Sequence, residues 1–461
     1  MKKIYVLVLT AIIAFSCSKD DDTTPEIENQ EVKEEEEEVI AENDSLVYFT
    51  LKTNAYYVEN FIESSYLILN DVDGNILEHT VIENDKVYEF KAKKEEAPEI
   101  FTVSRYIKIN QSYFKYNSLN SYYNIEKGTV WNFNGSKLDD NEEVVVIERK
   151  SFNLVVENVS EDVINHTLST PSDYFSRTHY GYRYDTHIEF NNVELEKQDS
   201  KFLLTLHFKD GKSKYMIIDN IIEDEERIVN ADNLNEFDSY IPINLPKSSE
   251  NYHKSLDFDY NDKVYTTTKY GVNIINNVQP TFGVLNDFEN FRVSISSRGE
   301  NFLYNYSQNT KELNDITINQ FNTDFEIISN YEKQFEFTTN VNHNHKHSSW
   351  SYNIENGFDY ENFNWYFHSD SRSYFVTPKI PQEFLDLYSN FDFSKLEYDS
   401  TVLEKSERAY NPFGEYQETA EEFPQFVKER ITFYSLEAKN KSSKNQKFQE
   451  KIKQIEKRLR Q

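Results

Sequence analysis

Short apolar segments separated by turn residues constrain the fold of this chain most. Many are rich in β-branched and aromatic side chains, which is typical of strands. Asp73-Gly74 and Asp210-Gly211 each separate two such segments, and glycine accepts the positive φ that a tight hairpin needs. The pattern predicts a mainly β fold. Alternation predicts that one strand face carries Phe202, Leu204, Leu206 and Phe208.

The spacing of these segments predicts two or three β-sandwich-like domains in tandem. Pro242 and Pro246 punctuate the chain before the last of them. A short helix is expected at residues 382–388. The predicted parts are an N-terminal β-sandwich-like domain (44–143), a second β domain (144–250) and a third β-rich region (251–438).

The C-terminal residues 439–461 have a different character. They contain nine Lys and Arg against two Glu, so the tail is basic. A narrow apolar stripe at helical spacing predicts a short amphipathic helix here, which docks on the acidic body of the chain or on an anionic partner. The alternative is a frayed helix surrounded by solvent. The stripe consists of Phe448, Ile452, Ile455 and Leu459.

The N-terminus has the features of a secretory leader. Lys2 and Lys3 precede an apolar run at residues 4–14, which is too short to span a bilayer. Cys17, the only cysteine in the chain, lies three positions after the end of this run. We expect residues 1–16 to be a signal peptide and residues 17–43 to be an acidic, disordered linker.

This leader resembles a bacterial lipoprotein signal peptide with its lipobox at residues 14–17, although Ala14 stands where many lipoboxes carry Leu. The resemblance implies that Cys17 is lipidated and becomes the first residue of the mature chain. Lys19, Asp20 and Asp21 resemble the surface-export signal of Bacteroidota lipoproteins. The implied location is the outer membrane, lipid-anchored by palmitate-type chains and exposed at the cell surface.

The charge excludes some partners. The formal net charge is −31, from 49 basic and 80 acidic residues, whereas nucleic-acid binding needs a basic surface.

No two of the ten glycines lie closer than seven positions, so the sequence contains no glycine-rich phosphate loop. With Cys17 lipidated, no thiol remains for a disulfide or a cysteine nucleophile.

Two groups of residues are candidates for a binding site. His343, His345 and His347 would share one face of a strand, where three neutral imidazoles can bind zinc. The alternative is a polar hairpin loop, and no other cofactor is expected. The second group is aromatic, and exposed rings can stack on sugars. Its members are Trp350, Tyr360, Trp365 and Tyr366, with Tyr180, Tyr182 and Tyr184 alternating in a second stretch.

For these aromatic residues the alternative is ordinary core packing, with Trp350 and Trp365 buried. We therefore expect a surface lipoprotein with a binding or assembly role rather than a catalytic one. Its ligand would be a glycan or an envelope protein. The competing hypothesis is an extracellular, metal-assisted hydrolase.

Overall fold

The computed structural model describes the β-rich part of the chain. The predicted signal peptide, linker and C-terminal helix lie outside the described residues, as do Cys17, Lys19, Asp20 and Asp21. The chain divides into two units between Asp44 and Ser45, and all that follows concerns the second. The described residues are 44–58, 62–111, 114–135, 150–170, 176–195, 201–245, 251–261, 263–273, 279–299, 301–318, 324–331, 334–356, 359–371, 374–406, 423 and 425–435.

The fold is mainly β, as the sequence predicts. The expected helix is confirmed as α1 (Gln382–Leu387), and no helix within the described residues is long and apolar enough to cross a membrane. Both Asp-Gly hairpins are confirmed. Gly74 (φ 79°) joins β2 (Ile62–Asn70) to β3 (Ile76–Val81), and Gly211 (φ 84°) joins β13 (Phe202–Phe208) to β14 (Ser213–Ile218).

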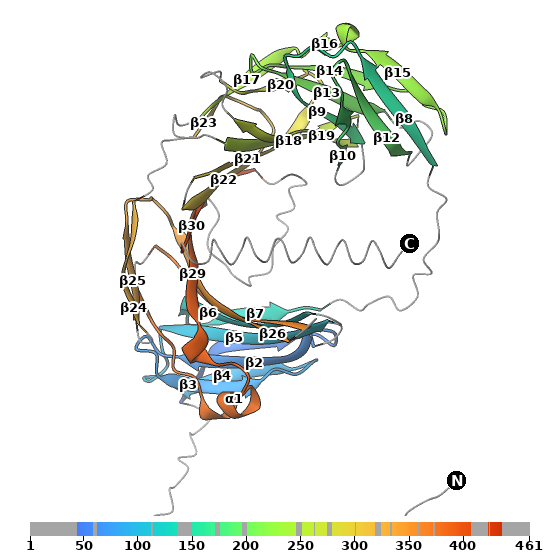
Figure 1. The fold of residues 1–461 in the computed structure, drawn as a ribbon. Helices are drawn as coiled ribbons and strands as arrows, with labels where there is room; N and C mark the ends of the chain where they lie inside the picture. The colour runs from blue at the N-terminus through green and yellow to red at the C-terminus, as the bar shows by residue number, and fades with distance from the viewer. Residues whose placement is uncertain are drawn as a thin grey trace, which may run out of the picture. The chain divides into compact units, whose positions relative to one another are not determined.

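A twelve-stranded sheet runs through the unit (Figure 1). It combines strands from residues 44–143 with strands from residues 251–438, so these two predicted regions share one sheet. The domain boundaries at these positions remain a prediction. In spatial order the strands are β19 (Lys263–Asn273), β18 (Asn251–Tyr260), β21 (Glu289–Arg298), β22 (Phe302–Thr310), β30 (Phe426–Tyr434), β29 (Glu397–Ser406), β26 (His345–Asn356), β27 (Asp359–Ser369), β6 (Phe114–Glu126), β5 (Ile100–Gln111), β2 and β3.

One end of this sheet forms a sandwich with a small sheet of three strands. Leu67 and Val103, from β2 and β5, pack against Phe49 and Trp131 of the small sheet. Burial of these apolar surfaces stabilises the two-layer arrangement. The small sheet contains β4 (Val87–Lys93), β1 (Ser45–Thr53) and β7 (Thr129–Phe133).

A second sandwich is formed by a four-stranded and a five-stranded sheet. Phe202, Leu204 and Leu206 are buried together on β13, which confirms the face predicted from their alternation. They pack against Phe152 and Phe190 of the facing sheet. The four-stranded sheet contains β11 (Tyr182–Arg183), β12 (His187–Leu195), β8 (Lys150–Glu157) and β15 (Glu226–Asn230). The five-stranded sheet contains β10 (Arg177–His179), β9 (Val163–Thr170), β13, β14 and β16 (Asn235–Glu236).

The largest core covers the other face of the twelve-stranded sheet. Phe384 of α1 packs there, and so do Phe335 and Phe375 of a three-stranded sheet. The covering strands are β24 (Phe325–Tyr331), β25 (Gln334–Thr339) and β28 (Tyr374–Val376), with β20 (Thr281–Val284), β17 (Ser239–Asn244) and β23 (Ile316–Thr317) beside β18 and β21 in the same core.

Candidate functional site

The predicted histidine cluster is divided between a coil and a strand. Strand β26 begins at His345, so the idea that all three imidazoles lie on one strand is wrong for His343. His345 and His347 do share a face of β26, because alternate residues of a strand point the same way. Within the described ranges, no group of three or more His, Cys, Asp or Glu is placed to hold a metal ion.

His347 contacts a histidine that the sequence analysis did not single out. Pairing of β26 with β27 sets it opposite His368, with ring centroids 5.5 Å apart, and His368 stacks on Tyr122 at 4.6 Å. Burial lowers the pKa of His347 to about 4, and burial together with His347 lowers the pKa of His368 to about 3. Both rings are therefore neutral at neutral pH and belong to the packing between strands.

An ion cluster lies on the same face as His345 and His347. Glu404, opposite His345 on β29, accepts hydrogen bonds from Arg430 (2.8 and 3.1 Å), and its other oxygen lies 2.8 Å from Lys428 Nζ. Burial alone would raise the pKa of Glu404, but the bonds from Lys428 and Arg430 outweigh it and hold the pKa below its ordinary value. The side chains here satisfy one another and form a structural network across β29 and β30.

The two predicted tryptophans are core residues. Trp350 is 9% exposed and Trp365 is 7% exposed. Trp350 packs edge-on against Phe335 (centroids 4.9 Å apart), and the Trp365 indole N–H donates to Ser121 Oγ at 2.9 Å. Their positions match the core-packing alternative, and the exposure that stacking on a sugar requires is not met.

Of the two predicted tyrosines, only Tyr366 has a described side chain, and it is half-buried. Tyr116 Oη donates to Tyr366 Oη at 3.3 Å, and burial together with Tyr116 raises the pKa of Tyr366. The backbone of Tyr360 pairs with Phe114, while its side chain lies outside what the structure describes. The predicted aromatic site around β26 and β27 therefore presents no open platform among its described side chains.

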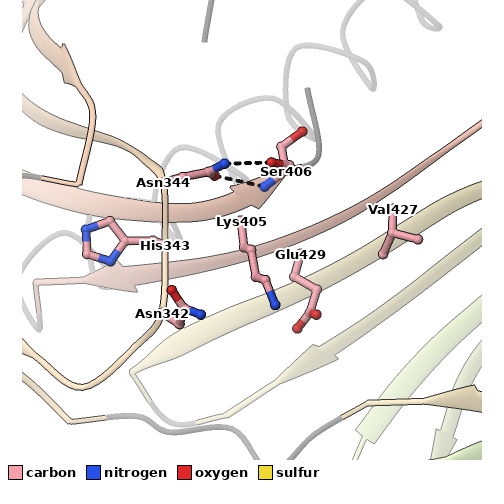
Figure 2. Close-up of a pocket in the computed structure, with 7 residues that line it drawn as sticks. All are labelled: Asn342, His343, Asn344, Lys405, Ser406, Val427 and Glu429. Atoms are coloured by element: carbon pink, nitrogen blue, oxygen red, sulfur yellow. Dashed lines mark hydrogen bonds between the residues drawn. The ribbon is translucent and has the colours of Figure 1, made fainter. Parts of the chain in front are cut away.

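A cavity of about 320 Å³ opens beside the coil that precedes β26 (Figure 2). Asn344 closes one side through two hydrogen bonds with the backbone of Ser406, at 2.6 and 2.9 Å. The imidazole of His343 donates from Nδ1 to the carbonyl of Val341 at 2.8 Å, which leaves Nε2 as an acceptor. Because Nε2 is buried, and has no partner among the described residues, it is not accessible to a ligand in the cavity.

Three exposed tyrosines lie in the second sandwich. Tyr180, Tyr182 and Tyr184 have exposed fractions of 52%, 70% and 48%. Tyr182 and Tyr184 alternate along β11 and its end, so they point to the same side of the sheet. Large exposed aromatic rings are uncommon in soluble domains, and a group of them marks a contact surface.

The strand that carries these tyrosines is held firmly. The guanidinium of Arg183 donates to the carbonyl oxygens of Ser160 (3.0 Å) and Val163. His166 Nε2 donates to the carbonyl of Gly181 at 2.9 Å. A Cβ at Gly181 would lie 2.6 Å from a methyl group of Ile188, so this position packs tightly on β12. These contacts tie the backbone around the tyrosines to the rest of the sandwich.

The outer face of this sheet combines rings with carboxylates. Tyr184 stacks in parallel on His187, with centroids 4.5 Å apart, and His187 Nε2 lies 3.3 Å from a carboxylate oxygen of Glu189. Strand pairing sets Tyr182 opposite Glu189 and His187 opposite Glu157. We call this set of five residues the tyrosine face. Figure 1 shows two of its strands, β12 and β8, side by side.

Comparison with known proteins does not extend this description. No family model matches the chain, and no curated protein matches it in sequence. The tyrosine face, the cavity beside β26 and the buried histidine pair are therefore interpreted from their own geometry and chemistry.

Proposed function

We propose that this chain is a lipid-anchored protein of the outer membrane, exposed at the cell surface, whose β unit binds a ligand rather than transforming one. The observation that carries the binding role is the tyrosine face, where large rings are exposed on a rigid sheet. The anchor rests on the sequence, in which the single cysteine, Cys17, lies three positions after the end of the apolar run. The charge of −31 supports partners other than nucleic acid.

The anchor is tested by metabolic labelling with radiolabelled palmitate. The wild type should incorporate label, because several acyl chains on Cys17 hold a protein stably at a membrane. Cys17→Ala should lose the label completely, whereas Ser18→Ala, a matched neighbour, should keep it. Equal labelling of the Cys17→Ala variant contradicts the anchor.

Surface exposure is tested by treating intact cells with external protease. Replacement of Lys19, Asp20 and Asp21 by Ala should leave the protein lipidated but protected, because the proposed export signal is gone. The matched control replaces Glu34, Glu35 and Glu36 by Ala, which removes charge elsewhere in the linker. Equal digestion of the export variant and the wild type contradicts a signal at these positions.

A further inference from the structure

We infer that the tyrosine face is a binding site for neutral carbohydrate chains. The inference rests on the proposed binding role and names the ligand class. Tyr182 offers the most open ring, at 70% exposure, and Tyr184 stacked on His187 offers a second flat surface. The C–H face of a sugar ring is apolar and flat, so it packs on an aromatic ring, and tyrosine loses little conformational entropy in doing so.

The groups between the rings match the edges of a sugar. Glu189 lies opposite Tyr182 across the strand pair, and Glu157 lies opposite His187. Their carboxylates accept hydrogen bonds and donate none at neutral pH, so they fit a ligand whose periphery consists of hydroxyl donors. The acyl chains of lipids, by contrast, have no donors to offer these acceptors.

The dimensions suit a chain rather than a single sugar. Along one row, strand pairing places Tyr182, Glu189, Val155 and Ile228 on four adjacent strands, and Ile228 is 53% exposed. Four strands span about 14 Å, from three spacings of about 4.8 Å. The row therefore presents contacts to several consecutive units of an extended ligand, with rings at one end and an aliphatic side chain at the other.

Charge decides which carbohydrates fit. Two carboxylates lie within the face, and the whole chain carries a net charge of −31. Uronic acids, sulfated glycans and teichoic-type phosphates would meet repulsion there, which weakens at high ionic strength. Neutral glucans, mannans and galactans meet none. The expected ligand is thus a neutral polysaccharide, and its affinity should change little with salt.

The inference is tested with the full-length protein in detergent by glycan array, followed by calorimetric titration of each retained oligosaccharide. The probes are α- and β-linked glucan, mannan and galactan oligosaccharides, with polygalacturonate as the acidic probe. At least one neutral probe should bind. Tyr182→Ala and Tyr184→Ala should each weaken it about tenfold or more, as for central aromatic contacts. Tyr182→Phe, which keeps the ring, should stay within about threefold.

Val72→Ala is the matched control, because Val72 is also exposed (61%) but belongs to the β2–β3 turn. Three results would overturn the inference. The protein binds no neutral probe, it binds polygalacturonate alone, or the Tyr182→Ala/Tyr184→Ala double variant binds a neutral probe as tightly as the wild type does. In the last case the protein still binds, so the proposed binding role survives. Capture of an envelope protein that the double variant loses also overturns the carbohydrate assignment while keeping that role. The anchor is tested separately, because a protein that carries no palmitate label can still be titrated with these oligosaccharides.

Discussion

The chain contains two groups of closely spaced aromatic residues, and the fold uses them in opposite ways. Around β26 and β27, Trp350 and Trp365 are enclosed between the twelve-stranded sheet and its cover. On β11 and directly after it, Tyr182 and Tyr184 lie in the open on an outer sheet face. Both groups alternate along strands, so alternation alone does not distinguish a core from a contact surface.

The difference arises from what lies over each sheet. The rings on β26 and β27 face α1 and the sheet of β24, β25 and β28, which flank the two strands in the chain and cover them through tertiary packing. Across the second sandwich, β12 and β13 bury each other's inner faces and leave the outer face of β11 and β12 uncovered by the core. Whether a ring is buried is therefore decided by tertiary contacts that neighbouring residues do not reveal.

The largest expected effect concerns the buried side of this comparison. Trp365→Ala should lower the free energy of unfolding by about 3–5 kcal/mol, because it leaves a cavity and removes the bond to Ser121. Urea unfolding followed by circular dichroism measures the change. A loss below about 1 kcal/mol would mean that the ring is not enclosed as described.

A smaller effect is expected from the buried histidine pair. The pKa of His347 is about 4 when folded, below its ordinary value of 6.5, mainly through burial, with Arg430 and Lys428 adding to the shift and Glu404 opposing it. The unfolded chain therefore binds more protons below pH 6.5, so the stability from this group is complete above pH 6.5 and is lost as the pH falls toward 4. Between pH 7.5 and 5, His347 alone should cost about 2 kcal/mol.

The check is urea unfolding at pH 7.5 and at pH 5 for the wild type and for His347→Gln. The variant should lose less stability on acidification than the wild type does, since glutamine does not titrate. His368→Gln should act in the same direction, because the pKa of His368 is also lowered, to about 3. Identical pH dependence in the wild type and in the His347→Gln/His368→Gln double variant would contradict the burial of this pair.

The ion cluster should contribute less. Glu404→Gln removes the charge that binds Arg430 and Lys428, both of which remain partly exposed, so a loss of about 1 kcal/mol is expected. A double-mutant cycle with Arg430→Met isolates the pairwise coupling. If the two losses add with no coupling, the contact between Arg430 and Glu404 does not persist in solution.

The smallest effect belongs to the exposed side of the comparison. Tyr182→Ala should change the free energy of unfolding by no more than about 0.5 kcal/mol, because its ring is 70% exposed. The same urea experiment serves, with Trp365→Ala as the contrasting variant. A loss comparable to that of the tryptophan variant would remove the distinction between the two aromatic groups.

The local features of the fold could be predicted, because turns, short helices and strand faces depend on residues that are close together in the sequence. The glycines at positions 74 and 211, the short helix at Gln382–Leu387 and the alternating face of β13 all follow from spacing. The histidine pair could not be predicted in the same way. His347 meets His368 through strand pairing, and Tyr122 joins them from another region of the chain.

The candidate site was predictable only in part. The alternation of Tyr180, Tyr182 and Tyr184 is visible in the sequence. The aromatic stretch near β26 is denser and is therefore the stronger candidate by sequence alone. The pairing of Tyr182 with Glu189 and the stack of Tyr184 on His187 offer a local signal, since β11 and β12 form a tight hairpin. The exposure of the tyrosine rings could not be predicted from the sequence, because it depends on which face of the sheet remains uncovered in the fold.

The parallel pairing of β6 with β27 has a consequence for how the chain is made. Tyr116 and Tyr366, which it brings together, are 250 positions apart, so this edge of β6 stays unpaired until most of the chain has been synthesised. Contacts this distant in sequence slow folding, and an open edge invites pairing with other chains. Folding should therefore depend on chaperones that hold the unfinished chain, and C-terminally truncated chains should aggregate rather than fold in part.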